Sequence, residues 1–216
     1  MVACRARFAG NSGAIAKNCN AAAAAQEQPN VEIILTRVLR RQIDAFEHHY
    51  HYDMGYAHRM LRASLGAFLR FAMFSRCAQV RQGISAAPWF AARIAAALYE
   101  DCGPCTQLVV RMAEEAGVEG ATLRAIVTDD EASLDADTRL ALSFAQAVLT
   151  HAPDCAALHD EAVLRWGERG VVSLALIIAN TRVYPTLKRA LGYAHACSRV
   201  EVGGQNIAPQ LFTARA

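Results

Sequence analysis

The stretch at residues 88–117, PWFAARIAAALYEDCGPCTQLVVRMAEEAG, carries the clearest structural pattern in this chain. Its first part, residues 88–98, is apolar and rich in alanine, which favours a buried helix that neighbouring helices approach closely. Its last part predicts a second helix, and Gly117 suits the left-handed residue just past a helix end. One apolar stripe of this second helix holds Cys105, Leu108, Met112 and Ala116. The two helices are joined by the acidic residues and the cysteine pair at 100–105.

The cysteine pair has the spacing of a redox centre. We expect Cys102 at or just before the helix N-terminus and Cys105 on the buried face of the first turn, with Pro104 where proline is tolerated. Residues three apart in a helical turn are neighbours, so their Cα atoms lie within the range of a disulfide. A helix N-terminus stabilises a thiolate, and a second thiol in reach can close the bridge. Half a zinc site and two inert cysteines are the alternatives; zinc would need a second Cys-x-x-Cys, which the chain lacks.

Composition limits the class of protein. The chain has 216 residues, 54% of them hydrophobic, and a formal net charge of +2, which predicts one domain and argues against a nucleic-acid partner. The longest strongly apolar run, residues 171–179, is too short to cross a membrane. Seven cysteines with one close pair indicate a reducing, cytoplasmic location. The cysteines expected to be free thiols are Cys4, Cys19, Cys77, Cys155 and Cys197.

The pattern of apolar residues predicts an all-α fold. Residues 1–30 are expected to be disordered or irregular, residues 31–200 to form a single helical domain, and residues 201–216 to be an irregular tail. One helix is predicted over 54–80, and another begins at Asp135 as N-cap. The helix after residue 170 should be kinked by Pro185. The first helix carries an apolar stripe of Val31, Ile34, Leu35, Val38, Leu39, Ile43 and Phe46.

Two histidine-containing groups are considered as metal sites, and we expect a metal at neither. His48 and His51 have helical spacing but no carboxylate or cysteine partner at ligand spacing. His151, Cys155 and His159 are spaced by four, but Pro153 separates the first from the other two.

The order of segments over about residues 88–196 resembles the carboxymuconolactone decarboxylase-like superfamily, in its alkylhydroperoxidase D-like branch. The resemblance consists of an apolar helix before the cysteine pair, AEEAGV at 113–118, LDADTRLA at 134–141, and Trp166-Gly167 before the helix over 171–180. Thioredoxins share Cys-Gly-Pro-Cys but place it after a strand, whereas a helix precedes it here. The resemblance implies a helical bundle assembled as a homotrimer or hexamer. It also implies reduction of a peroxide or small disulfide by an external thiol reductant, with no cofactor.

The chain departs from this branch at two positions. The branch has a histidine where this chain has Val109, and a glutamate where it has Phe90. Both belong to a proton relay, and neither valine nor phenylalanine can transfer a proton. Glu100 is our candidate substitute, with a solvated carboxylate at a helix end as its alternative role. His58 or the cluster around His48 are others.

The predicted function is a thiol-dependent oxidoreductase that cycles Cys102 and Cys105 between dithiol and disulfide. By resemblance Cys105 meets the peroxide and Cys102 resolves it; the residues alone equally allow a more exposed Cys102 to attack first. The alternative is a non-enzymatic helical oligomer that keeps the pair as a redox-sensitive or relic disulfide. A decarboxylase-type enzyme is a minor alternative, for which no acid–base set is visible.

Overall fold

A computed structural model describes the backbone of residues 18–193 and 199–211, with side chains from residue 31 onward. The chain divides into two units, Met1–Gln42 and Ile43–Ala216, and the long helix α1 (Asn18–Tyr50) spans the boundary between them. The predicted domain boundary at residue 30 therefore differs from the observed division, which falls after Gln42.

In the first unit the structure describes the N-terminal part of α1. This helix begins at Asn18, so the expectation of a disordered or irregular segment is wrong for 18–30, while 1–17 lie outside the described residues. The alanine-rich sequence explains the helix, because alanine has the highest helix propensity. The apolar stripe is exposed here: Val31 is 66% exposed, Ile34 60% and Val38 45%.

The second unit is mainly helical, which confirms the all-α class. After α1 it contains α2 (Gly55–Ala63), α3 (Leu65–Cys77), α4 (Ala86–Tyr99), α5 (Gly103–Glu115) and α6 (Gly120–Thr128). A short 3-10 helix, η1 (Glu131–Ser133), precedes α7 (Ala136–Thr150) and α8 (Cys155–Ala190). None of the helices in the described part of the chain combines the length and apolar character needed to cross a membrane.

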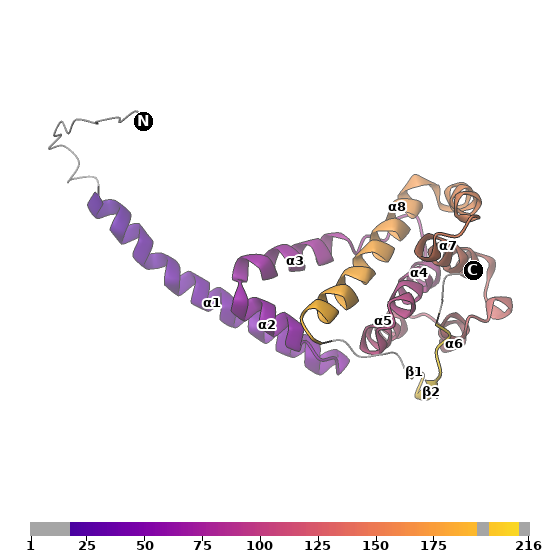
Figure 1. Cartoon of the computed structure of the whole chain (residues 1–216), viewed down its shortest axis with the longest axis horizontal. Helices are drawn as coiled ribbons and strands as arrows, with labels where there is room; N and C mark the ends of the chain where they lie inside the picture. The colour runs from indigo at the N-terminus through magenta and orange to yellow at the C-terminus, as the bar shows by residue number, and fades with distance from the viewer. Residues whose placement is uncertain (1–17, 194–198, 212–216) are drawn as a thin grey trace, which may run out of the picture. The chain divides into compact units, whose positions relative to one another are not determined.

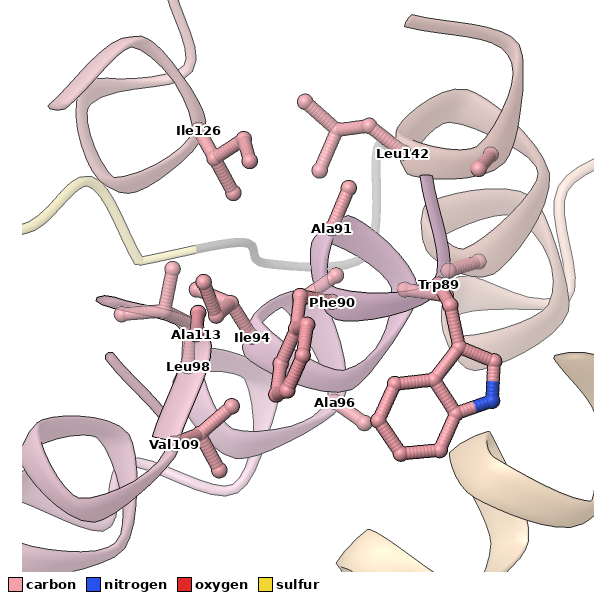
Figure 2. Packing of buried hydrophobic residues seen from close by; sticks show 14 of the residues in the cluster. Trp89, Phe90, Ala91, Ile94, Ala96, Leu98, Val109, Ala113, Ile126 and Leu142 are labelled. Atoms are coloured by element: carbon pink, nitrogen blue, oxygen red, sulfur yellow. The ribbon is translucent and has the colours of Figure 1, made fainter. Parts of the chain in front are cut away.

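Helix α4 is the centre of this unit. It packs against α5, α6, α7 and α8 (Figure 1). Every residue over 88–98 is buried, as expected of a helix that is apolar all round. The alanines at 91, 92, 95, 96 and 97 have no exposed surface, so neighbouring helices approach the α4 backbone closely. Figure 2 shows Ile94 and Leu98 of α4 together with Ala113 of α5 and Leu142 of α7 in one hydrophobic cluster.

Several helix boundaries differ from the predictions. The single helix predicted over 54–80 is two helices, because Ser64 adopts an extended conformation (φ −162°, ψ 109°) and its side chain accepts a hydrogen bond from the N–H of Ala67 at the start of α3. Helix α8 contains Pro185 but breaks its helical geometry at Gly167, where φ is 66°. The N-cap at Asp135 is confirmed, with hydrogen bonds from the N–H groups of Asp137 and Thr138.

The C-terminal tail is not wholly irregular, which corrects the prediction for 201–216. Strands β1 (Val200–Val202) and β2 (Gln205–Ile207) form an antiparallel hairpin, in which Val202 pairs with Gln205. Gly203 and Gly204 form its two-residue turn with φ of 55° and 77°, the left-handed geometry that matches the strand twist. Val200 and Val202 are buried, and the hairpin packs on α5 and α6.

Candidate functional site

Cys102 and Cys105 form a disulfide at the start of α5. Cys102 is the N-cap and Cys105 lies in the first turn, with a Cα–Cα distance of 5.2 Å. This confirms the predicted placement and proximity of the pair. The two residues are almost equally buried, at 4% and 5% exposure, so the expectation that Cys102 is the more exposed is wrong. Ala97 of α4 forms one buried cluster with both cysteines.

The junction between α4 and α5 fixes the direction in which the cysteines point. Asp101 has a left-handed φ of 48°, a conformation that aspartate adopts more readily than most residues. The carbonyl of Cys102 accepts hydrogen bonds from the N–H of Thr106 at 2.9 Å and from its hydroxyl at 3.1 Å. These contacts lie within the first turn of α5, and the N–H of Cys102 donates to the carbonyl of Ala97 in α4 at 3.4 Å, which joins that turn to the end of α4.

Glu100, the predicted relay residue, has both carboxylate oxygens occupied by arginine. Its Oε1 accepts from Arg182 Nε at 2.8 Å, and its Oε2 accepts from Arg189, which also donates to the Glu100 carbonyl at 2.8 Å. The Glu100 side chain is 7% exposed, so this is a buried carboxylate with two half-exposed cationic partners. The relay role stays a prediction, and these contacts favour a structural role that ties the end of α4 to α8.

Phe90 and Val109, the two positions at which the chain departs from the branch motif, belong to the hydrophobic cluster. They are 5% and 4% exposed. Figure 2 shows both side chains among the buried hydrophobic residues. Val109 also lines the pocket described next. Both side chains are packed in the apolar cluster, and neither can transfer a proton.

A pocket of about 500 Å³ opens beside Cys105. Its walls come from the end of α1, the segment after it, α2, α3, α4, α5 and α8. Most lining residues are apolar or aromatic, among them Phe46, Phe68, Phe71, Leu108 and Met112. Cys105 lines the pocket and Cys102 does not, so a small molecule in it would meet Cys105 first.

A buried tyrosine and a buried lysine stand behind Cys105. The Tyr52 hydroxyl lies 3.8 Å from Cys105 Sγ, and Lys188 Nζ donates to that hydroxyl at 3.2 Å. Because a disulfide sulfur carries no proton, Tyr52 is the donor in the oxidised state. The Lys188 ammonium also lies over the ring of Tyr52, 4.6 Å from its centroid. The three side chains thus form one line of contacts from Lys188 through Tyr52 to Cys105.

Burial shifts the proton affinities of this line. Removal from water raises the pKa of the Tyr52 hydroxyl well above its usual value of 10.0. It lowers the pKa of Lys188 below the 10.5 of an ordinary lysine, because the ammonium loses its hydration. Lys188 is 2% exposed and makes no ion pair with a carboxylate among the residues with described side chains. Its neutral form is therefore more accessible than that of a surface lysine.

Arg93 of α4 is a second buried cation, and it lines the pocket. It is 6% exposed, and its Nε has no hydrogen-bond partner. The guanidinium lies 5.5 Å from the ring centroid of Trp89 and 6.0 Å from that of Phe90. Burial lowers the pKa of Arg93 from its usual value. The hydroxyl of Ser75, another lining residue, is buried and likewise unpaired.

The histidines considered in the sequence do not lie against the disulfide in any described contact. His58 Nε2 lies 3.2 Å from Asp44 Oδ1 and 3.3 Å from Glu47 Oε2. These three side chains offer ligand atoms within 4.8 Å of one another, but Glu47 already accepts from the N–H of Met54 at 2.7 Å. The rings of His48 and His51 are 6.2 Å apart.

The remaining cysteine-containing group separates as predicted. Helix α7 ends at Thr150 and α8 begins at Cys155, so His151 does not share a helix with Cys155 and His159. Cys77 and Cys155 are free, as expected. The side chains of Cys4, Cys19 and Cys197 lie outside the described part of the chain.

Sequence reasoning missed Tyr52, Lys188 and Arg93. One signal was available for Lys188. The chain has 22 lysines and arginines, and only Lys17 and Lys188 are lysines, so a lone lysine in an apolar helix stands out. Tyr52 follows α1 in a run of histidines and tyrosines that reads equally well as an exposed helix end. No family model, curated protein or solved structure matches this chain.

Proposed function

We propose that this protein is a thiol-dependent oxidoreductase that reduces a peroxide, or a small disulfide, with Cys102 and Cys105. The observation that carries the proposal is the position of Cys105, which lines the pocket while bonded to Cys102. Further support comes from Tyr52 and Lys188, which supply a buried line of proton donors and acceptors where Val109 and Phe90 supply none.

In the reduced enzyme the line would remove a proton from Cys105. Neutral Lys188 accepts the proton of the Tyr52 hydroxyl, and Tyr52 accepts the proton of the Cys105 thiol. The result is a Cys105 thiolate and a Lys188 ammonium. The N-terminus of α5 stabilises the thiolate through its free N–H groups.

The reaction then follows with its atoms and electrons balanced. The Cys105 thiolate attacks the terminal oxygen of the peroxide, the O–O bond breaks, and the alkoxide takes the proton from Lys188 through Tyr52 to leave as an alcohol. Cys105 is now a sulfenic acid. The Cys102 thiol attacks its sulfur, the disulfide forms, and water leaves. Two thiols of an external reductant restore the pair by exchange and become a disulfide themselves.

This proposal includes the family resemblance, the cytoplasmic location and a homo-oligomeric state. The exposed apolar residues Val31, Ile34 and Val38 of α1 support an assembly of several copies, because such a stripe is ordinarily covered. Light scattering of the purified chain measures the number of copies, and a monomeric mass would contradict this part of the proposal.

The deciding experiment is peroxide consumption with dithiothreitol or dihydrolipoamide as reductant. We expect turnover by the wild-type chain and none by Cys102→Ser or Cys105→Ser, while Cys77→Ser, which changes an exposed free thiol, keeps its activity. A sulfenic-acid trap should label Cys102→Ser and not Cys105→Ser, because Cys105 attacks first. If the wild type is no faster than the serine variants, the enzyme proposal fails and a non-enzymatic helical oligomer is favoured.

A further inference from the structure

The buried guanidinium of Arg93 has no anionic partner among the residues whose side chains the structure describes. Its Nε is unbonded. The rings of Trp89 and Phe90 offer the guanidinium only a cation–π attraction. An uncompensated buried charge is among the most destabilising arrangements in a protein interior, so its presence in a pocket wall requires an explanation.

The explanation that fits the pocket is a bound anion. A guanidinium presents N–H donors in a rigid fork that matches a carboxylate, and aromatic rings behind it hold that fork in place. The unpaired Ser75 hydroxyl lines the same pocket and could donate to the same ligand. Arg76, the other arginine of the lining, is exposed and already solvated.

The rest of the pocket defines the remainder of the ligand. Most of its wall is apolar or aromatic, with phenylalanine and tyrosine the most frequent side chains, which favours an apolar body. A volume of about 500 Å³ accommodates a small organic molecule together with its charged end. Cys105 lines the same space, so a ligand anchored at Arg93 shares the pocket with the reactive sulfur.

We infer that Arg93 binds the carboxylate of an apolar organic acid, and that the oxidant reduced by this protein is a hydroperoxide of such an acid. The claim that a hydroperoxide is reduced rests on the proposed function. The claim that the ligand is an apolar acid rests on the Arg93 pocket alone. The inference assigns Arg93 to substrate binding, a role that the cysteine chemistry itself does not require.

Binding can be measured apart from turnover. The probe is octanoate, with octanamide as its uncharged match, titrated calorimetrically into the Cys102→Ser/Cys105→Ser chain. We expect octanoate to bind at least about tenfold more tightly than octanamide, as a charged hydrogen-bonded pair contributes more than a neutral one. Arg93→Gln and Arg93→Met should abolish this preference. Arg70→Gln removes an exposed arginine outside the pocket and should keep it.

Folding of the variants is tested by thermal melting, which also gives an independent prediction. Arg93→Met should melt at the same temperature as the unliganded wild type or higher, because it removes an unpaired buried charge. Octanoate should raise the melting temperature of the wild type and not that of Arg93→Met. Equal binding of octanoate and octanamide by the wild type, or loss of the preference in Arg76→Gln but not in Arg93→Gln, would overturn the inference.

A turnover measurement separates this inference from the proposed function. Wild-type kcat/KM is compared for a hydroperoxide of a medium-chain fatty acid and for its methyl ester. Faster reduction of the acid, with the difference lost in Arg93→Gln, supports the inference. Turnover without any preference for the acid overturns it and leaves the thiol chemistry intact. Octanoate binding without any turnover supports the anion pocket and contradicts the proposed reaction.

Discussion

The two sides of the disulfide differ in whether their buried charges are paired. On the junction side, Glu100 is buried, and both of its oxygens accept hydrogen bonds from Arg182 and Arg189. On the pocket side, the buried cations Lys188 and Arg93 have no carboxylate partner in the described part of the chain. Their polar contacts are a tyrosine hydroxyl for Lys188 and aromatic faces for Arg93.

The difference indicates which side is structural and which side is functional. A buried charge that its partners already pair holds the elements that carry it together. An unpaired buried charge costs stability, and such groups cluster where a site binds or reacts. We therefore expect changes at Glu100 to act on folding and changes at Tyr52, Lys188 and Arg93 to act on activity.

The largest expected effect is on turnover at the pocket side. Tyr52→Phe removes the hydroxyl that connects Lys188 to Cys105 and should lower kcat by about 100-fold, the lower end of the contribution of a proton-transfer group. Its melting temperature should stay close to that of the wild type, because the ring remains.

The matched control for this change is Tyr50→Phe. It removes a hydroxyl that donates to Glu115 and does not line the pocket, so kcat should be unchanged. Steady-state peroxide consumption measures both variants. The prediction is contradicted if Tyr52→Phe keeps its kcat while a fully folded Glu100→Gln is slowed. In that case Glu100 is the proton relay.

The second effect is on stability at the junction side. Glu100→Gln keeps the shape of the side chain but removes its charge, and should lower the free energy of unfolding by about 1–3 kcal/mol. Denaturant unfolding measures the loss. The control is Asp137→Asn, which breaks a more exposed pair with Arg165 and should cost less stability than Glu100→Gln. An equal loss in both would show that the Glu100 cluster contributes no more than a surface pair.

The smallest effect is a pH dependence of stability that comes from Lys188. Its folded-state pKa is lowered by burial, so between that value and 10.5 the unfolded chain binds more protons than the folded chain. The free energy of unfolding should therefore rise with pH through this window, by at most about 1.4 kcal/mol per pH unit.

Lys188→Met should remove that rise, which distinguishes the contribution of Lys188 from those of other titrating groups. The buried tyrosines act in the opposite direction at higher pH. The pKa values of Tyr52 and Tyr56 are raised above 10.0, so stability falls as pH increases beyond that value in both chains. Denaturant midpoints over a pH series measure the slopes, and an identical rise in the wild type and Lys188→Met would contradict an unpaired, buried Lys188.

The predictable parts of the fold are those set by local pattern. The buried helix α4, the cysteine pair at the start of α5, Gly117 after its end and the Asp135 cap were all readable, because helical spacing and capping chemistry depend on residues close in sequence. The break at Ser64 and the hairpin turn at Gly203-Gly204 also have local signals, a possible N-cap and a Gly-Gly pair between two three-residue strands. Those signals were outweighed by the longer helical pattern and by the short length of the strands.

Local sequence patterns are sufficient to predict a helical protein with a cysteine pair able to close a disulfide at a helix N-terminus, because a spacing of three residues and a following amphipathic helix bring the two cysteines together. The surroundings of the pair depend on tertiary packing. Tyr52 lies 53 residues from Cys105, and Lys188 lies 136 residues from Tyr52, so no local pattern relates them. Tertiary packing brings Tyr52 to Cys105 and Lys188 to Tyr52, and it pairs Glu100 with Arg182, because contacts between residues distant in sequence form only when the helices pack.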